Sequence, residues 1–163
     1  EKILTFLNTL DQMNNEQIKE IKEENVYFLL DPNPGSIPIY QFINPVIDGD
    51  VKLAIDYFER TVENIHVVAC LGTLKNRIQL MQRSNGLYNL GYNTPNKVAE
   101  ALDTKVYPIK LMWHLVINNE AVDKICFLIT KLEKDIKGDS KIDKEILFKR
   151  YLIEMTLIAR GAK

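Results

Sequence analysis

Hydrophobic residues recur at helical spacing along most of this chain and are separated by short polar breaks. The clearest example runs from Pro108 to Ile136, where a short apolar segment and a longer amphipathic one flank Asn118-Asn119. Proline suits the first helical position because its missing N–H needs no partner there, and asparagine can cap the helix that follows. The second segment has one apolar face, made of Val122, Ile125, Ile129, Leu132 and Ile136. We therefore predict a helical hairpin that ends at Gly138.

The same spacing predicts further helices before and after this hairpin. They cover residues 2–10, 16–30, 51–69, 74–81, 96–103 and 141–159, with a short strand over 26–30 as an alternative. Gly72 is expected to end or bend the long helix that follows Asp48-Gly49-Asp50. Loops are predicted over residues 31–38 and 84–94, which are rich in proline or in glycine and asparagine. Thr94-Pro95 is a strong helix start, whereas Ser140 and Asp143 form only part of a capping box.

These segments amount to seven or eight helices and predict an all-α fold. The expected arrangement is a set of stacked antiparallel hairpins, either an irregular α-solenoid-like array or an orthogonal bundle. A length of 163 residues suits a single all-helical domain over residues 1–163. The chain begins with Glu1 and shows no signal peptide, so a domain excised from a longer protein is the alternative to a complete chain.

An internal repeat is suggested by the segment from Pro38, which resembles the segment that begins 70 residues later. The matched pairs are Pro38 with Pro108, Ile39 with Ile109, Val46-Ile47 with Val116-Ile117, and Ile55 with Ile125. The turn Asp48-Gly49-Asp50 then falls on Asn118-Asn119-Glu120. Two hairpins of one design would stack so that each buries the apolar face of the next. This hypothesis requires Ile47 and Ile117 to lie in similar surroundings.

The composition excludes several classes of protein. Hydrophobic residues make up 46% and charged residues 26% of the chain, and no apolar run is long enough to span a membrane. Two cysteines do not make a disulfide framework, so we expect an intracellular protein, cytoplasmic or nuclear. The net charge of −1 divides into about −5 for residues 1–103 and about +4 for residues 104–163. Such a division can orient a partner, although a solvated surface is the more common meaning.

The residues that could carry chemistry are few. His66, Cys70, His114 and Cys126 could formally supply four zinc ligands, but the close Cys-x-x-Cys pairs of structural zinc sites are missing. Glu63 and His66 have the spacing of half a di-iron site, and no second such pair exists. A phosphate-binding glycine loop is missing too. We therefore predict no catalysis, no cofactor and no metal, and we expect His66 to act as a cap or at the edge of the core.

The most apolar segment is the last predicted helix, in which hydrophobic residues extend most of the way round between 146 and 158. Such a helix is either the centre of a bundle or the end of an array whose next unit is missing. An exposed patch of this kind would mark an interface. We predict a protein-interaction or assembly module that binds a protein partner, or a second copy of itself, through this helix. The residues chosen as protein-binding are Phe148, Tyr151 and Met155, with burial in the core as the alternative for all three.

Nucleic-acid binding is the alternative function. Residues 97–112 resemble a helix-turn-helix in outline, with a small Ala99 and with Val98, Leu102, Ile109 and Met112 at core positions. The resemblance fails at Asp103, where the motif usually has glycine, and at Pro108. It implies phosphate contacts from Lys105 and Lys110, fewer cations than such a helix usually presents. The lysines between 131 and 149 alternate with acids, which favours a solvated surface over an RNA or phosphate groove.

Overall fold

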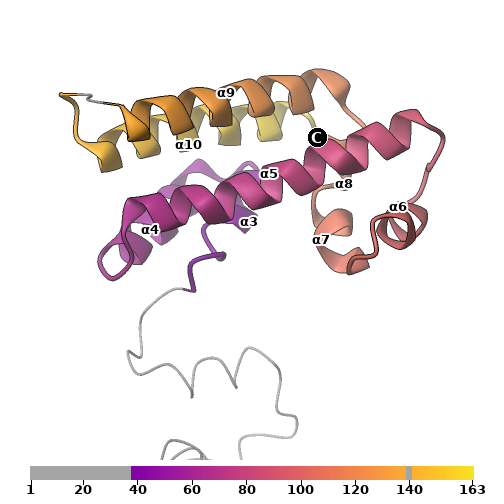
Figure 1. Cartoon of the computed structure of the whole chain (residues 1–163). Helices are drawn as coiled ribbons and strands as arrows, with labels where there is room; N and C mark the ends of the chain where they lie inside the picture. The colour runs from indigo at the N-terminus through magenta and orange to yellow at the C-terminus, as the bar shows by residue number, and fades with distance from the viewer. Residues whose placement is uncertain (1–37, 139–140) are drawn as a thin grey trace, which may run out of the picture. The chain divides into compact units, whose positions relative to one another are not determined.

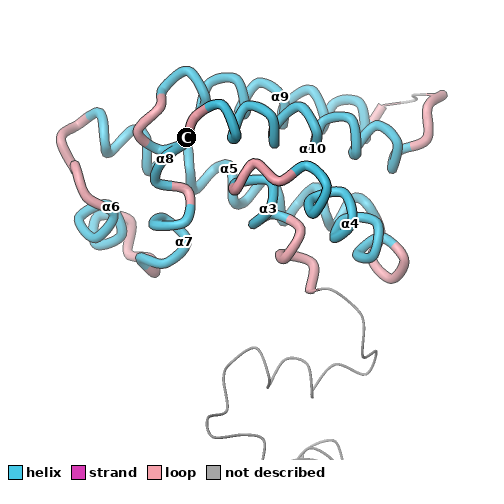
Figure 2. The backbone as a smooth tube through the Cα atoms, turned by 180° about the vertical axis from the view of Figure 1, so that it is seen from behind, coloured by secondary structure: helices cyan, strands magenta, loops and turns pink. Residues whose placement is uncertain are grey.

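Every regular element in the computed structural model, which describes residues 38–138 and 141–163, is a helix (Figure 2). The helices are α3 (Ile43–Ile47), α4 (Val51–Val62), α5 (Val67–Asn89), α6 (Pro95–Ala101), α7 (Val106–Leu111), α8 (Trp113–Val116), α9 (Asn119–Lys137) and α10 (Lys144–Gly161). The all-α prediction is thereby confirmed for the described part of the chain. The helices predicted over residues 2–10 and 16–30, and most of the loop predicted over 31–38, lie outside the described residues.

The helices pack as a bundle around a long antiparallel pair, α9 and α10 (Figure 1). The two short helices α3 and α4 lie against α10, and the long helix α5 lies against α9. Helices α6, α7 and α8 follow one another at one end of the bundle, where α8 contacts both α5 and α9. Of the two arrangements predicted from the sequence, these contacts fit a bundle.

An aromatic cluster lies in the core where α10 meets α3 and α4. Phe42, Phe58 and Phe148 come from these three parts of the chain and are fully buried. The rings of Phe58 and Phe148 stack with centroids 4.5 Å apart, and Phe42 meets both rings edge-on. Aromatic contacts of this kind add stabilisation beyond the area that they bury. The inner side of helix α10 therefore forms part of the core of the bundle.

Several helix boundaries follow local signals that the sequence displays. The hydroxyl of Thr94 caps α6, and Pro95 takes the first helical position as predicted. The side chain of Asn118 accepts a hydrogen bond from the Ala121 N–H at 3.1 Å and caps α9. At its other end α9 stops before Gly138. The main hairpin of the sequence analysis is confirmed in outline, with its first segment divided into α7 and α8.

The long helix predicted over residues 51–69 is in fact two helices. Helix α4 ends at Val62, and α5 begins at Val67 after a short turn. The prediction was wrong because Val62, Ile65 and Ala69 continue the apolar spacing across the break, which contains no proline or glycine. The spacing of apolar residues cannot reveal a break between two helices when the same spacing continues across that break.

Helix α5 is also longer than predicted at its C-terminal end. Gly72 lies inside the helix, where glycine costs only about 1 kcal/mol relative to alanine. The turn predicted from residue 84 begins instead after Asn89. The Nδ2 groups of Asn85 and Asn89 donate to Asn119 Oδ1 at 2.6 and 3.0 Å, and Asn85 also donates to the Val116 carbonyl. These asparagines thus connect α5 to the α8–α9 turn.

The start of α10 differs from the prediction by three residues. Asp143 is the N-cap, and its Oδ1 accepts hydrogen bonds from the N–H groups of Glu145 and Ile146 at 2.8 and 3.2 Å. Helix α10 therefore begins at Lys144 rather than at residue 141. Ser140, the other member of the partial capping box, lies outside the described residues.

The internal repeat receives no support from the structure. Gly49 has a φ of +70°, whereas its counterpart Asn119 is the first residue of α9. Ile47 is buried, whereas Ile117 is 45% exposed, so the two isoleucines lie in different surroundings. What the two segments share is local, namely a short helix followed by a longer helix with a capped start.

Candidate protein-binding surface

Helix α10 carries two apolar stripes on opposite sides. The inner stripe packs into the bundle and contains Leu147, Phe148, Tyr151, Leu152, Met155 and Ala159. The outer stripe contains Ile146, Ile153 and Leu157, which are 61%, 38% and 49% exposed. Spacings of seven and four place these three side chains on one face of the helix, together with Arg150.

The residues predicted to bind a protein partner belong to the inner stripe. Phe148 and Met155 have no exposed surface, and Tyr151 is 7% exposed. The hydroxyl of Tyr151 donates a hydrogen bond to Asp135 Oδ2 at 2.6 Å, and this bond, aided by burial, raises the pKa of the tyrosine to about 12. A partner cannot touch these side chains while the bundle is intact. We therefore correct the choice of residues, since the alternative of core burial applies to all three.

At Leu157 the outer stripe of α10 borders a shallow groove between α10 and α9. The groove is lined by Lys124, Phe127 and Leu128 from α9 and by Glu154, Leu157 and Ile158 from α10. Phe127 is 60% exposed, which is unusual for an aromatic side chain in the middle of a long helix. We call the face formed by Phe127, Ile146, Ile153 and Leu157 the outer face of the α9–α10 hairpin.

Sequence reasoning identified the segment that carries this face but chose the wrong stripe. Both stripes of α10 are apolar, so hydrophobicity alone does not distinguish inside from outside. Arg150 is the signal that could have done so, because a charged side chain is rarely buried and Ile146, Ile153 and Leu157 share its face. Phe127 was missed because it lies next to the buried Ile125 and Leu128 in the sequence.

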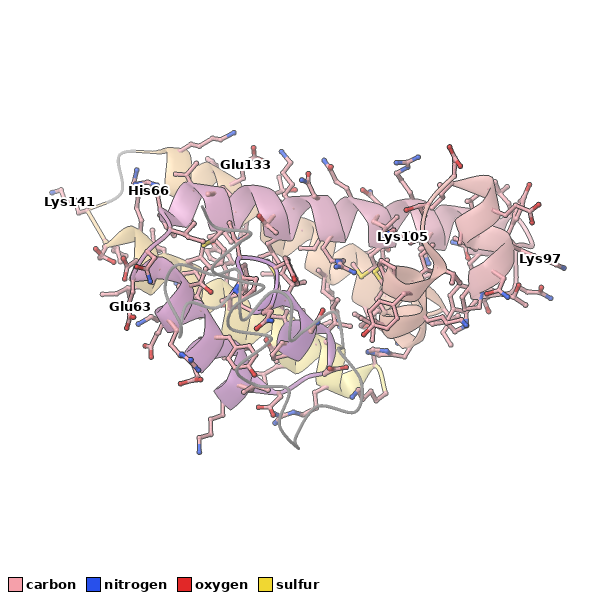
Figure 3. The ribbon with its side chains drawn as sticks, turned by 90° about the horizontal axis from the view of Figure 1, so that it is seen from below. Glu63, His66, Lys97, Lys105, Glu133 and Lys141 are labelled. Atoms are coloured by element: carbon pink, nitrogen blue, oxygen red, sulfur yellow. The ribbon has the colours of Figure 1, made fainter. Side chains whose placement is uncertain are left out.

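The residues predicted for nucleic-acid binding are exposed at the end of the bundle formed by α6 and α7. Lys105 is the N-cap of α7 and Lys110 lies in its last turn. Figure 3 shows Lys97 and Lys105 in the half of the bundle away from Glu63 and His66. Asp103 adopts a φ of +48°, the conformation that glycine would take in the helix-turn-helix motif. Helix α7 has only six residues, which is about 9 Å of helix.

The histidines and cysteines are separated in the fold. His66 caps α5 through Nδ1, which accepts a hydrogen bond from the Val68 N–H at 3.2 Å, one of the two roles expected for it. His114 Nε2 lies 3.1 Å from the carbonyl oxygen of Ile47, and burial lowers the pKa of this imidazole. Burial raises the pKa of the Cys70 thiol to about 11.

These positions leave little scope for metal or thiolate chemistry in the described residues. No group of three or more histidine, cysteine or acidic side chains there is arranged to hold a metal ion. Burial also raises the pKa of Cys126, and a protonated thiol is a poor nucleophile. An apolar cavity beside Arg77 has a volume of about 20 Å³, which is room for about one water molecule.

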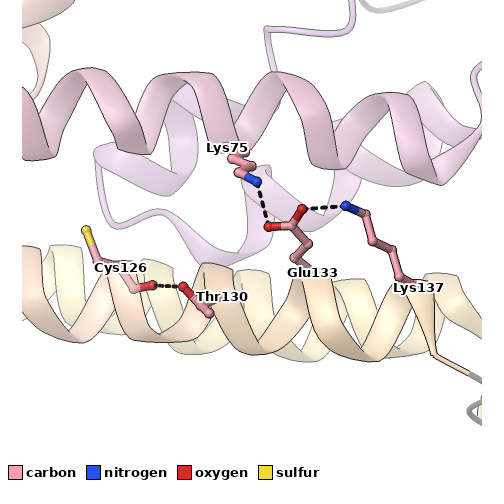
Figure 4. Close-up of polar contacts among 5 residues, drawn as sticks. All are labelled: Lys75, Cys126, Thr130, Glu133 and Lys137. Carbon is pink, nitrogen blue, oxygen red and sulfur yellow. Dashed lines mark hydrogen bonds and ion pairs between the residues drawn. The ribbon is translucent and has the colours of Figure 1, made fainter.

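A carboxylate between two lysines connects α5 and α9 behind the outer face (Figure 4). Glu133 Oε1 accepts from Lys137 Nζ and Oε2 from Lys75 Nζ, each at 2.6 Å. The hydrogen bond from Lys137 and then that from Lys75 lower the pKa of Glu133 to about 2. Lys75 is the cross-helix partner, so this pair ties α5 to the hairpin that presents the outer face.

We expect the stability of the bundle to depend on pH through Glu133. Its folded-state pKa lies below the ordinary glutamate value, so its contribution is complete above about pH 4.5 and is lost as pH falls toward 2. The Glu133→Gln variant should therefore lose less stability than the wild type between pH 5 and 3. Urea unfolding at several pH values measures this difference. Glu100→Gln, on the exposed face of α6, is the control; an unchanged pH slope in Glu133→Gln would contradict the assignment.

None of the helices within the described ranges is both long and apolar enough to cross a membrane. Comparison of the chain with protein-family models, with curated proteins and with solved structures found no match. A function can therefore be argued only from the outer face of the α9–α10 hairpin.

Proposed function

We propose that this chain is a non-catalytic protein-interaction module and that a protein partner covers the outer face of the α9–α10 hairpin. The observation that carries the proposal is the exposure of Ile146, Ile153 and Leu157 along one face of α10, with Leu157 and the exposed Phe127 of α9 lining the same groove. Single exposed apolar residues are common, but large apolar side chains that line one groove together are typical of an interaction site. An aromatic residue at the edge of a groove is the kind of residue that dominates binding energies.

The surroundings of this face support a stable platform. Helix α10 is packed on its inner side against α3, α4 and α9, and the aromatic cluster fixes its position. The two helices of the hairpin are further joined by the hydrogen bond between Tyr151 and Asp135. A rigid surface loses little conformational freedom on binding, which favours affinity.

Site-specific photo-crosslinking tests the proposal. A photoreactive amino acid placed at Leu157 should give one discrete adduct with a protein from the source cells. The same group at Val68, which is 45% exposed on α5, should not. With the captured protein purified, Phe127→Ala should raise the dissociation constant about tenfold or more, as expected for a hot-spot residue. Identical adducts at both positions, or an unchanged dissociation constant, would refute the proposal.

Self-association through the same face is the version of the proposal in which the partner is a second copy. Sedimentation of the purified chain would then give a dimer that Leu157→Ser converts to a monomer. Val68→Ser is the matched control, because it makes the same chemical change at a comparably exposed site. A monomer at all accessible concentrations dismisses this version.

Nucleic-acid binding remains an alternative, favoured by the conformation of Asp103 in the turn between α6 and α7. Val98, Ala99, Ile109 and Met112 are buried, as the resemblance to a helix-turn-helix requires. Affinity for duplex DNA that falls steeply with salt and drops in the Lys105→Ala, Lys110→Ala double variant would support it. We expect no such binding, since a six-residue α7 offers only these two lysines.

A further inference from the structure

His114 joins parts of the chain that lie far apart in the sequence. Its Nε2 lies 3.1 Å from the carbonyl oxygen of Ile47, the last residue of α3. Because a carbonyl oxygen can only accept, Nε2 carries the proton, and α8 donates this hydrogen bond to the start of the α3–α4 turn. Two residues further along, the Gly49 carbonyl accepts a hydrogen bond at 2.8 Å from Arg160 Nε, near the end of α10. Side chains from α8 and α10 thus hold the same turn.

We infer that His114 makes this junction sensitive to pH: the neutral ring holds α8 to the α3–α4 turn, and its protonation loosens the turn together with the last turn of α10. Leu157 of the outer face lies about one helical turn before Arg160. Acid should therefore also weaken partner binding, a consequence that rests on the proposed function, whereas the loosening of the junction does not.

The contact between the turn and α10 is close enough to transmit such a change. Gly49 packs so tightly against α10 that a Cβ placed on it would lie 2.8 Å from the Cα of Arg160. Closely packed backbones of this kind do not move independently. A turn released from His114 therefore disturbs the end of α10 as well.

The surroundings of the ring favour its neutral form. Burial lowers the pKa of His114, and the hydrogen bond to the Ile47 carbonyl offsets this only in part. Lys163, beyond the end of α10, lowers the pKa further, whereas Asp48 in the turn raises it. The helices α5, α7 and α9 also contact α8, but no charged side chain of their described residues shifts the pKa of the ring. Protonation would thus add a positive charge to a junction that already contains Arg160 and Lys163.

The direction of the pH effect follows from the lowered pKa. The folded junction binds a proton less readily than an exposed histidine, whose pKa is about 6.5. The contribution of His114 to stability is therefore complete above about pH 6.5 and declines as pH falls toward the folded-state pKa. Because opening of the turn exposes the ring, acid increases the population of opened molecules.

Hydrogen exchange of the full chain tests the inference. The N–H groups of Gly49 and Asp50 bond to carbonyls within α3. Their protection, corrected for intrinsic exchange rates, should fall severalfold between pH 7 and about pH 5.5. Protection in the last turn of α10 should fall with it, while protection in the middle of α9 should not.

The two histidines of the chain provide a matched pair of variants. His114→Gln keeps a side-chain N–H donor but cannot be protonated, so the fall in protection should disappear. His66→Gln, at the exposed start of α5, should leave the fall unchanged. The same fall in His114→Gln, or no fall in the wild type, would overturn the inference. So would an equal loss of protection in every helix, which indicates a general loss of stability.

An NMR titration of the wild-type ring protons keeps the inference testable if His114→Gln does not fold. The pKa of His114 should lie below about 6.5, and a pKa at or above that value would overturn the inference.

The binding consequence is measured with the protein that the crosslink at Leu157 captures. Weaker binding at about pH 5.5 in the wild type, but not in His114→Gln, supports it. Equal affinity at both pH values overturns the regulation and leaves the interaction surface standing. Absence of a crosslinked protein counts against the proposed function, and hydrogen exchange then decides the junction on its own.

Discussion

Replacement of Phe148 with alanine is expected to lower the free energy of unfolding by about 3–5 kcal/mol. The ring is fully buried, stacks on Phe58 at 4.5 Å and meets Phe42 edge-on at 6.1 Å. Its removal leaves a cavity bounded by α10, α4 and the start of α3, three elements that cannot all move inward without losing other contacts. Urea unfolding followed by circular dichroism measures the loss.

Ile146→Ala is the matched control, since Ile146 lies on the same helix but is 61% exposed. Its effect on stability should stay within about 0.5 kcal/mol. A loss below about 1 kcal/mol for Phe148→Ala would mean that the aromatic cluster is not the centre of the core. If Phe148→Ala instead kept its stability but no longer bound the partner, Phe148 would be part of the binding surface after all.

The contrast between Phe148 and Ile146 shows how far sequence reasoning could go in α10. Because hydrophobic residues extend most of the way round α10, the sequence predicted that this helix packs against other parts of the protein, or a partner, on more than one side. The two stripes have similar composition, and which of them faces the core depends on α3, α4 and α9, whose relative positions no local pattern encodes. Arg150 was the one clue to which stripe is exposed. It becomes informative only when the residues of α10 are assigned to separate faces of the helix, because Arg150 then falls among the residues of the outer stripe.

Helix ends followed the sequence where a side chain itself makes the cap. Thr94 and Asn118 each accept a hydrogen bond from the backbone N–H three residues onward, so the signal is local and was identified. The helical course of residues 84–89 was missed for the opposite reason. Glycine and asparagine there favour a turn in isolation, but Asn85 and Asn89 gain hydrogen bonds to Asn119, some thirty residues away. Tertiary contacts outweighed local preference.

The turn at Asp48-Gly49-Asp50 was expected to copy the one at Asn118-Asn119-Glu120, and it does not, because the end of α10 lies against it. Arg160 Nε donates to the Gly49 carbonyl at 2.8 Å. Gly49 has a φ of +70°, and a Cβ added there would lie 2.8 Å from the Arg160 Cα. Only glycine fits this position, since the left-handed backbone and the close approach exclude a side chain together.

We therefore expect Gly49→Ala to lower the free energy of unfolding by about 2–6 kcal/mol. Backbone strain contributes about 1–3 kcal/mol, and overpacking against α10 adds about 1–3 kcal/mol. The contacted atoms include the backbone Cα of Arg160, so rotation of a side chain cannot relieve the clash. Thermal and urea unfolding of the purified variant measure the effect.

Gly91→Ala separates the two contributions. Gly91 also has a positive φ, +99°, but no atom lies within 4 Å of its added Cβ, so this variant carries the backbone strain alone. The loss in Gly49→Ala should exceed that in Gly91→Ala by the cost of displacing the end of α10. Equal losses of unfolding free energy in the two variants would show that contact with α10 adds nothing to the cost of a side chain at position 49. Since α10 carries Ile153 and Leu157, a shift of its last turns should also weaken partner binding in Gly49→Ala, whereas Gly91→Ala should leave binding unchanged.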